Sequence, residues 1–272
     1  MSFYRNRFKL IAVDKDLGVI LKKMGFTDDS RGIINRYIKV DGAWDPHLEN
    51  SRNFILDCVR DRNYKDVAVY GSGWHLDLPL EQLSRLCNHV WLYDLVHPRQ
   101  ILHKIKKFKN VTSVTADVSG VLKDVYEFVR SHRSHAERSR NIFRPEYPST
   151  PFGVTVPPDF AISLNLLSQI GDLVTGYLSH HVSLSEPEAD DLAATLQESH
   201  LKLMMQQPSC LITDVREVWY DRDDKPCKTK QLIKCSLPVG KRSATWQWDF
   251  DPLAEYNPGF VTRSEVIALE LE

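Results

Sequence analysis

A glycine turn stands between an apolar segment and a helical pattern in the first half of the chain. The apolar residues 67–70 lead into Gly71 and Gly73, and Asp94 follows 23 residues after Gly71. Glycine adopts backbone conformations closed to other residues and lets a ligand approach the main chain. In nucleotide-binding βαβ units, an acid about 20 residues beyond the glycines accepts hydrogen bonds from ribose hydroxyls. The spacing therefore predicts a turn and an acid that hold a nucleoside together.

Two further polar residues stand where predicted strands end. Asp117 follows residues 111–116, and Asn165 follows residues 160–164. The carboxyl ends of parallel strands lie at one edge of a sheet, beside the point where the strand order reverses. We therefore expect Asp94, Asp117 and Asn165 to converge with the glycine turn at that edge.

Helical patterns alternate with these strands. Asp45 and Pro46 begin a helix ahead of the first strand, Pro79 begins the next, Ser119 caps a third, and Ser185 or Ser183 starts a long one. Further strands are expected at 210–215, 230–237, 244–250 and 266–271. Strand and helix in alternation predict an α/β fold with a parallel sheet and right-handed crossovers.

The ordered set of the glycine turn, Asp94, Asp117 and Asn165 resembles the class I S-adenosylmethionine-dependent methyltransferases, over residues 45 to 272. The resemblance implies a Rossmann-like, doubly wound, mostly parallel seven-stranded sheet with an antiparallel C-terminal strand, and S-adenosylmethionine as the cofactor. It implies that Asp94 takes the ribose, that Asp117 lies by the adenine, and that Asn165 faces the methyl group. The expected cofactor contacts are Tyr70, Gly71, Ser72, Gly73, Trp74, His75, Asp94, Leu95, Asp117, Val118 and Asn165.

Two positions in the glycine turn depart from the family. Tyr70 stands where the family has an acid, and His75 stands where it has a third glycine, so that His75 must point away from the ligand or reshape the loop. Two alternatives stay open. An NAD(P)-dependent oxidoreductase needs only the glycine turn and Asp94, and leaves Asp117 unexplained. A catalytically inactive S-adenosylmethionine-binding module would keep the pocket without the transfer.

Methyl transfer needs an aligned nucleophile, a dry site and, for some acceptors, a base. Asn165 and Ser168, at the end of the fourth strand, are expected to orient the acceptor, and His180 or His181 is the expected base. Leu166 follows Asn165 where an Asn-Pro-Pro-Tyr motif would have proline, which argues against methylation of a nucleic-acid base. The sequence thus predicts a methyltransferase and leaves its acceptor unidentified.

The composition bears on the class of acceptor and on the cellular compartment. A net charge of −1 gives no general attraction to nucleic acid or to an acidic membrane, so a small-molecule acceptor is favoured slightly, and nucleic acid stays open through the arginines of residues 131–159. The five scattered cysteines are typical of a reduced, cytoplasmic protein, and no metal site or membrane span is expected. The oligomeric state cannot be read from these features.

The expected organisation has two parts and one insertion. Residues 1–44 form an N-terminal extension, which we interpret either as a cap over the site or as a packing or dimer contact. Residues 45–272 form the Rossmann-like domain, with an arginine- and proline-rich insertion at 131–159, a length typical of lids and binding loops.

Overall fold

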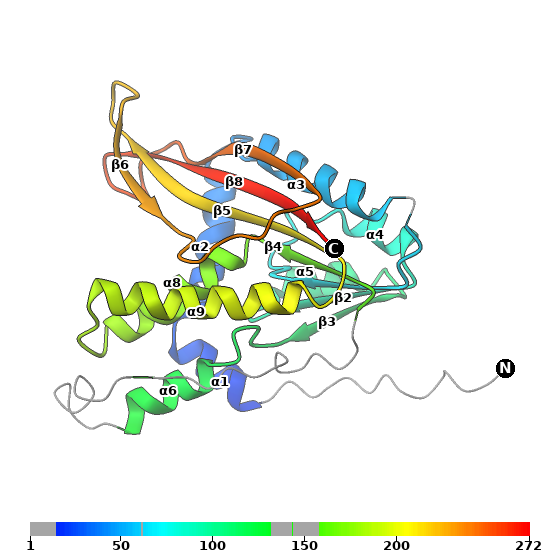
Figure 1. Ribbon diagram of the computed structural model, residues 1–272, viewed down its shortest axis with the longest axis horizontal. Helices are drawn as coiled ribbons and strands as arrows, with labels where there is room; N and C mark the ends of the chain where they lie inside the picture. Colours follow the sequence, from blue (N-terminus) through cyan, green and yellow to red (C-terminus); the bar gives the residue numbers. More distant parts are fainter. Residues whose placement is uncertain (1–14, 61, 132–142, 144–157) are drawn as a thin grey trace.

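The computed structural model describes residues 15–60, 62–131, 143 and 158–272, which form a central sheet between two layers of helices (Figure 1). The strands are β1 (Asp66–Tyr70), β2 (His89–Asp94), β3 (Val111–Thr115), β4 (Phe160–Leu164), β5 (Ser209–Tyr220), β6 (Pro226–Gln231), β7 (Arg242–Asp251) and β8 (Val261–Leu271). The helices are α1 (Lys15–Lys23), α2 (Phe26–Lys39), α3 (Asp45–Val59), α4 (Leu80–Leu86), α5 (Arg99–Ile105), α6 (Leu122–Ser131), α8 (Leu167–Ser179) and α9 (Glu186–Met204). The expected insertion lies almost entirely outside the described residues.

The strand order β3-β2-β1-β4-β5-β8-β7 confirms the expected doubly wound sheet. Strands β1 to β5 are parallel, whereas β8 lies between β5 and β7 and runs antiparallel to both. An eighth strand, β6, pairs with the outer part of β5 beside this path of seven. The order reverses between β1 and β4, and the crevice at the carboxyl ends of these strands is the place where open α/β sheets bind ligands.

The edge strand β3 is half-buried along most of its length, whereas β1, β2 and β4 are buried on both faces. Because side chains alternate along a strand, Val67 and Val69 of β1 pack against α3, α4 and α5, while Ala68 and Tyr70 pack on the opposite face with α9. This double burial explains why β1, β2 and β4 are mainly apolar runs in the sequence.

Helices α8 and α9 form the second layer together with α6 and α1. Ser185 begins α9 with a capping box, in which its hydroxyl accepts the backbone N–H of Glu188 and the Glu188 carboxylate accepts the backbone N–H of Ser185 (2.8 Å). Ile20 and Leu21 of α1 join a separate apolar cluster with Val125 of α6 and Val174 of α8. The N-terminal segment therefore packs on the helix layer and continues into α2.

The strand expected at 230–237 is wrong beyond Gln231. Leu232 and Ile233 turn into the core, where they are 4% and 6% exposed. The side chain of Gln197 in α9 donates to the carbonyl oxygen of Leu232 (2.9 Å) and accepts from the backbone N–H of Lys234 (2.7 Å). One helix side chain thus takes the hydrogen bonds that a neighbouring strand would have supplied.

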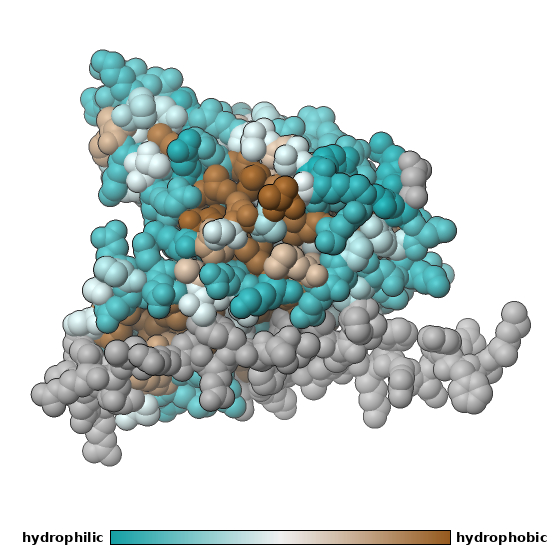
Figure 2. All heavy atoms as spheres, viewed as in Figure 1, coloured by the Kyte–Doolittle hydropathy of each residue, from teal (hydrophilic) through white to brown (hydrophobic). Residues whose placement is uncertain are grey.

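The loop after β6 covers part of the sheet between α9 and the C-terminal strands. Figure 2 shows hydrophobic residues gathered in the middle of this face, with hydrophilic residues around them. Ile233 and Leu237 of the loop pack on the sheet core, and Val239 is 97% exposed. Among the helices of the described ranges, none is long and apolar enough to cross a membrane.

Candidate functional site

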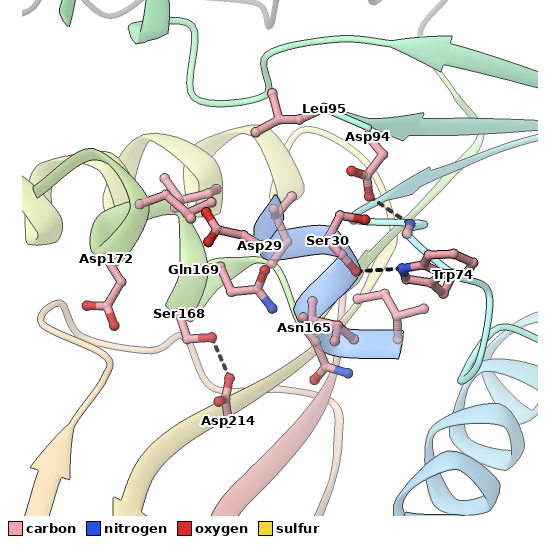
Figure 3. A pocket seen from close by; sticks show the side chains of 18 of the residues that line it. Asp29, Ser30, Trp74, Asp94, Leu95, Asn165, Ser168, Gln169, Asp172 and Asp214 are labelled. Atoms are coloured by element: carbon pink, nitrogen blue, oxygen red, sulfur yellow. Dashed lines mark hydrogen bonds between the residues drawn. The ribbon is translucent and has the colours of Figure 1, made fainter. Parts of the chain in front are cut away.

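A cavity of about 500 Å³ opens at the carboxyl ends of the parallel strands. Its walls come from the turn after β1, the ends of β2, β3 and β4, and residues of α8, β5 and β7, with α2 across one side (Figure 3). Small-molecule sites in proteins usually measure about 300–1,000 Å³. The cavity therefore has the size and the place in the fold that suit a cofactor together with part of a second molecule.

The two glycines of the turn have different physical roles. Gly71 has φ +81°, and a Cβ atom there would lie 2.6 Å from the carbonyl oxygen of Leu164. Gly73 has φ +43°, and a Cβ atom there would lie 3.8 Å from Oδ2 of Asp94. Gly71 is thus required for close packing of the turn on β4, while Gly73 is required mainly by its left-handed backbone.

Asp94 holds the glycine turn in place. Its Oδ2 accepts the N–H of Gly73 at 2.7 Å, and its Oδ1 accepts the N–H of Val96 at 3.1 Å (Figure 3). Burial raises the pKa of the Asp94 carboxyl, although these N–H groups favour its ionised form. Each carboxylate oxygen has a further lone pair, so Asp94 can still accept ribose hydroxyls.

Asp117 caps α6. Its Oδ1 accepts from the N–H of Ser119 (2.9 Å) and from the Ser119 hydroxyl (2.5 Å), and its Oδ2 accepts the N–H of Leu122 (2.9 Å). Burial raises the pKa of this carboxyl as well. Asp117 lines the cavity with Val118, and Leu95 lines it beside Asp94, so the strand ends bring together the residues expected around a nucleoside.

Four predicted site residues do not line the cavity. The Tyr70 ring is fully buried in the core on the α9 face, 5.3 Å from the Tyr93 ring. His75 is turned into the protein, with φ +55°, and neither ring nitrogen has a hydrogen-bond partner among the described residues. His180 is exposed at the end of α8, and His181 contacts the Tyr177 carbonyl oxygen (2.8 Å). The structure therefore does not bring either candidate base to the site.

The α2 helix covers the cavity, a role that the sequence left open. Ser72 and Trp74 of the turn line the cavity, as expected, and the indole N–H of Trp74 donates to the carbonyl oxygen of Ser30 at 2.7 Å (Figure 3). Asp29 and Arg36 of α2 also reach the lining. This placement favours the cap interpretation for α2, whereas α1 packs on the helix layer; residues 1–14 lie outside the described residues, and the domain boundary stays a prediction.

Asn165 joins three segments at the end of β4. It has φ +49°, and its Nδ2 lies 2.7 Å from Oδ2 of Asp77 and 3.3 Å from Nε2 of His47. Trp246 donates its indole N–H to Nδ1 of His47 at 3.0 Å, so the hydrogen of the neutral imidazole is on Nε2. Because Nε2 then cannot accept a hydrogen bond, the Asn165 side-chain amide donates to Asp77. Burial lowers the pKa of His47 to about 3 and raises the pKa of Asp77 to about 6.

Ser168 donates its hydroxyl hydrogen to Asp214 at the lower edge of the cavity in Figure 3. Strand β5 has a bulge at Val215. Asp214 pairs with residue 266 of β8 and Arg216 pairs with the next one, residue 265, so Val215 is an extra residue in the ladder. Because of this extra residue, Asp214 and Glu217 both line the cavity, although three positions along a regular strand place side chains on opposite faces. Asp77, Asp214 and Glu217 were all missed by the sequence reasoning.

Aromatic side chains form the wall opposite the glycine turn. Trp248 and Phe250 of β7 line the cavity with Trp44, and the His47 ring stacks on Trp248 at 4.0 Å between centroids. The Trp44 indole N–H donates to the Phe250 carbonyl oxygen at 2.9 Å, which fixes the wall to the start of α3. The alternation of aromatic residues at 246, 248 and 250 can be seen in the sequence and predicts a strand. No feature of the neighbouring sequence indicates that this strand lines the site.

Known proteins resemble this chain only weakly, in sequence and in structure. No protein-family model matches the chain, and no curated protein matches it. Similar solved structures include the N-methyltransferase NodS from Bradyrhizobium japonicum with S-adenosyl-L-homocysteine, at 8% identity, 82% coverage of this chain, 86% of that chain, and a TM-score of 0.40. The 1,6-didemethyltoxoflavin-N1-methyltransferase from Burkholderia thailandensis aligns at 11% identity, 99% and 98% coverage, and a TM-score of 0.43. An rRNA methylase from Streptococcus thermophilus aligns at 11% identity, 83% and 97% coverage, and a TM-score of 0.35.

These scores place no individual residue, so the fold assignment depends on the topology of this chain. The order β3-β2-β1-β4-β5-β8-β7, with β8 antiparallel, is the class I methyltransferase fold. The chain has this fold with a sequence far from those of the similar structures.

Proposed function

We propose that the protein binds S-adenosylmethionine in this cavity and transfers its methyl group to an acceptor bound beside Asn165. The observation that carries the proposal is the convergence of Gly73, Asp94, Asp117 and Asn165 on one cavity at the switch between β1 and β4. A nicotinamide-binding Rossmann domain has the same crevice, but its classic strand order, 3-2-1-4-5-6, has no place for an antiparallel β8 between the last two strands.

The residues present fit an adenosyl cofactor. Asp94 has free acceptor capacity for ribose hydroxyls, and Leu95, Val118 and Leu122 offer apolar contact to a flat base. Ser72 is 1% exposed, and its hydroxyl has no hydrogen-bond partner among the described residues, as expected where a ligand supplies one. His75, the departure from the family pattern, does not reach the cavity and therefore does not obstruct it.

The cofactor, when bound, supplies an electrophilic methyl group and its own leaving group. The protein has to position the acceptor and exclude water. The Oδ1 atom of Asn165, just after β4, and the hydroxyl of Ser168, in the first turn of α8, are acceptors that can orient an attacking group, and residues of α2 line the same cavity. Asp77 or Asp214, rather than His180 or His181, lies where it can receive a proton.

Calorimetric titration of the purified protein with S-adenosylhomocysteine and with NAD tests this function. We expect saturable micromolar binding of S-adenosylhomocysteine alone, because only this ligand suits the fold. Binding of NAD alone would contradict the proposal.

Transfer is tested separately from binding. Labelled S-adenosylmethionine is incubated with the protein and with fractions of a cell extract as acceptors, and we expect label in one fraction together with released S-adenosylhomocysteine. Cofactor binding without transfer to any fraction would assign the chain to the binding modules.

A further inference from the structure

We propose that the acceptor end of the cavity binds a protonated amine carried on an aromatic or apolar body. We define the acceptor end as the part lined by Trp44, Asp77, Asn165, Asp214, Glu217 and Trp248. The inference rests on the proposed function, because it names the class of molecule that would receive the methyl group once its ammonium has given one proton to Asp77 or Asp214 and so freed the nitrogen lone pair.

Carboxylates outnumber cations at this end of the cavity. Asp77, Asp214 and Glu217 line it, and Asp29 and Asp172 line the same cavity, whereas Arg36 is the single lysine or arginine among the described lining residues. Lys230 lies behind the lining and pairs with Asp172 at 2.7 Å, which offsets one negative charge. Figure 3 shows Asp172 and Asp214 on the side of the cavity away from Asp94. The wall is therefore short of positive charge where the acceptor would lie.

The carboxylates of this wall act on one another. Burial is the largest effect on Asp214 and Glu217 and raises the pKa of both. Asp172 raises the pKa of Asp214 further, and Asp214 and Asp172 raise that of Glu217, whereas Lys230 lowers both and the Ser168 hydrogen bond lowers that of Asp214. Burial also raises the pKa of Asp77. A cation in the cavity would favour the ionised form of all these groups, whereas an anionic acceptor would be repelled.

The aromatic wall suits the rest of such a molecule. Trp44, Trp248 and Phe250 contribute apolar edges to the lining, although Trp44 and Trp248 are only 2% and 8% exposed, and a cation near an aromatic ring face is attracted by its quadrupole. The protein already uses this contact, since the Arg36 guanidinium lies 4.7 Å from the Phe250 ring centroid and 4.6 Å from that of Tyr256.

Two unsatisfied polar atoms lie in the same lining. Oδ1 of Asn165 is buried and has no hydrogen-bond partner among the described residues, so an amine N–H can donate to it. Nε1 of Trp248, in a side chain 8% exposed, is also without a partner there; because its N–H is a donor, it would pair with an acceptor on the body of the ligand and not with the ammonium group. Within the described ranges, no three His, Cys, Asp or Glu side chains converge as a metal ion requires, which favours an organic cation.

Three matched probes test the charge preference: phenethylamine, 2-phenylethanol and 3-phenylpropionate. They share one ring and a short chain and carry a positive, a neutral and a negative end at pH 7.5. Each is titrated by calorimetry into the full-length protein saturated with S-adenosylhomocysteine. We expect phenethylamine to bind at least tenfold more tightly than 2-phenylethanol, and 3-phenylpropionate to bind most weakly.

A double variant, Asp214→Asn with Glu217→Gln, assigns the preference to this wall. Asn keeps an oxygen that can accept from Ser168, so the fold is expected to persist, and S-adenosylhomocysteine affinity within twofold of wild type verifies it. We expect phenethylamine affinity to fall at least tenfold and 2-phenylethanol affinity to change less than twofold. The matched control is the exposed Asp223→Asn, in the turn after β5, which should leave all affinities unchanged.

The outcomes separate the two proposals. Phenethylamine that does not bind, that binds no better than 2-phenylethanol, or that keeps its preference in the double variant overturns the amine inference and leaves the methyltransferase proposal standing. Failure of S-adenosylhomocysteine to bind overturns the methyltransferase proposal, and the same titrations without it still measure the charge preference of the cavity.

Discussion

Replacement of Asp94 by alanine measures the contribution of the predicted ribose contact. The wild-type carboxylate accepts two backbone N–H groups, from Gly73 and Val96, and has lone pairs left for ribose hydroxyls. A hydrogen bond to a charged group contributes about 1.5–3 kcal/mol. Since about 1.4 kcal/mol corresponds to a tenfold change in binding, loss of one such bond weakens S-adenosylhomocysteine about 10- to 100-fold.

Asp94→Asn separates the ligand contact from support of the turn. Asparagine keeps one oxygen for the Gly73 N–H but no negative charge for the ribose. Burial raises the pKa of Asp94, so the ionised carboxylate opposes folding above its unfolded pKa and asparagine removes that cost. We therefore expect this variant to stay within about 1 kcal/mol of wild type in unfolding free energy, while alanine leaves the Gly73 N–H unpaired and costs about 1–3 kcal/mol.

Isothermal titration with S-adenosylhomocysteine and urea unfolding supply the two measurements, with the exposed Asp223→Ala as the control. Weaker binding in both Asp94 variants, with a stability loss confined to alanine, supports the assignment. Unchanged affinity in Asp94→Ala would refute it, because the carboxylate would then serve only to hold the glycine turn.

Three further predictions concern the same framework. Gly71→Ala should lower the unfolding free energy by more than about 1 kcal/mol in urea unfolding, because its Cβ would lie 2.6 Å from the Leu164 carbonyl oxygen and the backbone has φ +81°. The control Gly18→Ala should cause no such loss, since a Cβ there meets nothing within 4 Å. Burial raises the pKa of Asp77 from 3.8 to about 6, so ionisation of this carboxyl opposes folding. The unfolding free energy of wild type, relative to that of Asp77→Asn, should therefore rise as pH falls from about 6 to 4. A difference that does not change with pH would contradict the burial of this group. Ser185→Ala should cost about 0.5–2 kcal/mol by loss of the capping box of α9, and an unchanged urea midpoint would show that the box contributes nothing.

The sequence by itself determined the framework and the cofactor side of the site. Mainly apolar runs marked β1, β2 and β4 because strands buried on both faces need them, and β-branched residues marked the half-buried β3. Once those strands are parallel and in order, the residues directly after them, such as Gly73, Asp94 and Asn165, must meet at one edge. The local sequence pattern, together with the rule that ligands bind at the carboxyl ends of parallel strands, was sufficient to predict this part of the fold.

The acceptor side was decided only by tertiary structure. A bulge in β5 turns Glu217 to the same side as Asp214, and β7 brings Trp248 to the cavity from the far edge of the sheet. The cap α2 meets the glycine turn through the Trp74–Ser30 hydrogen bond, between residues 44 positions apart. No periodicity reports such contacts, because they depend on strand register and long-range packing. For the same reason His180, near Asn165 in sequence, ends one helix length away, at the exposed end of α8.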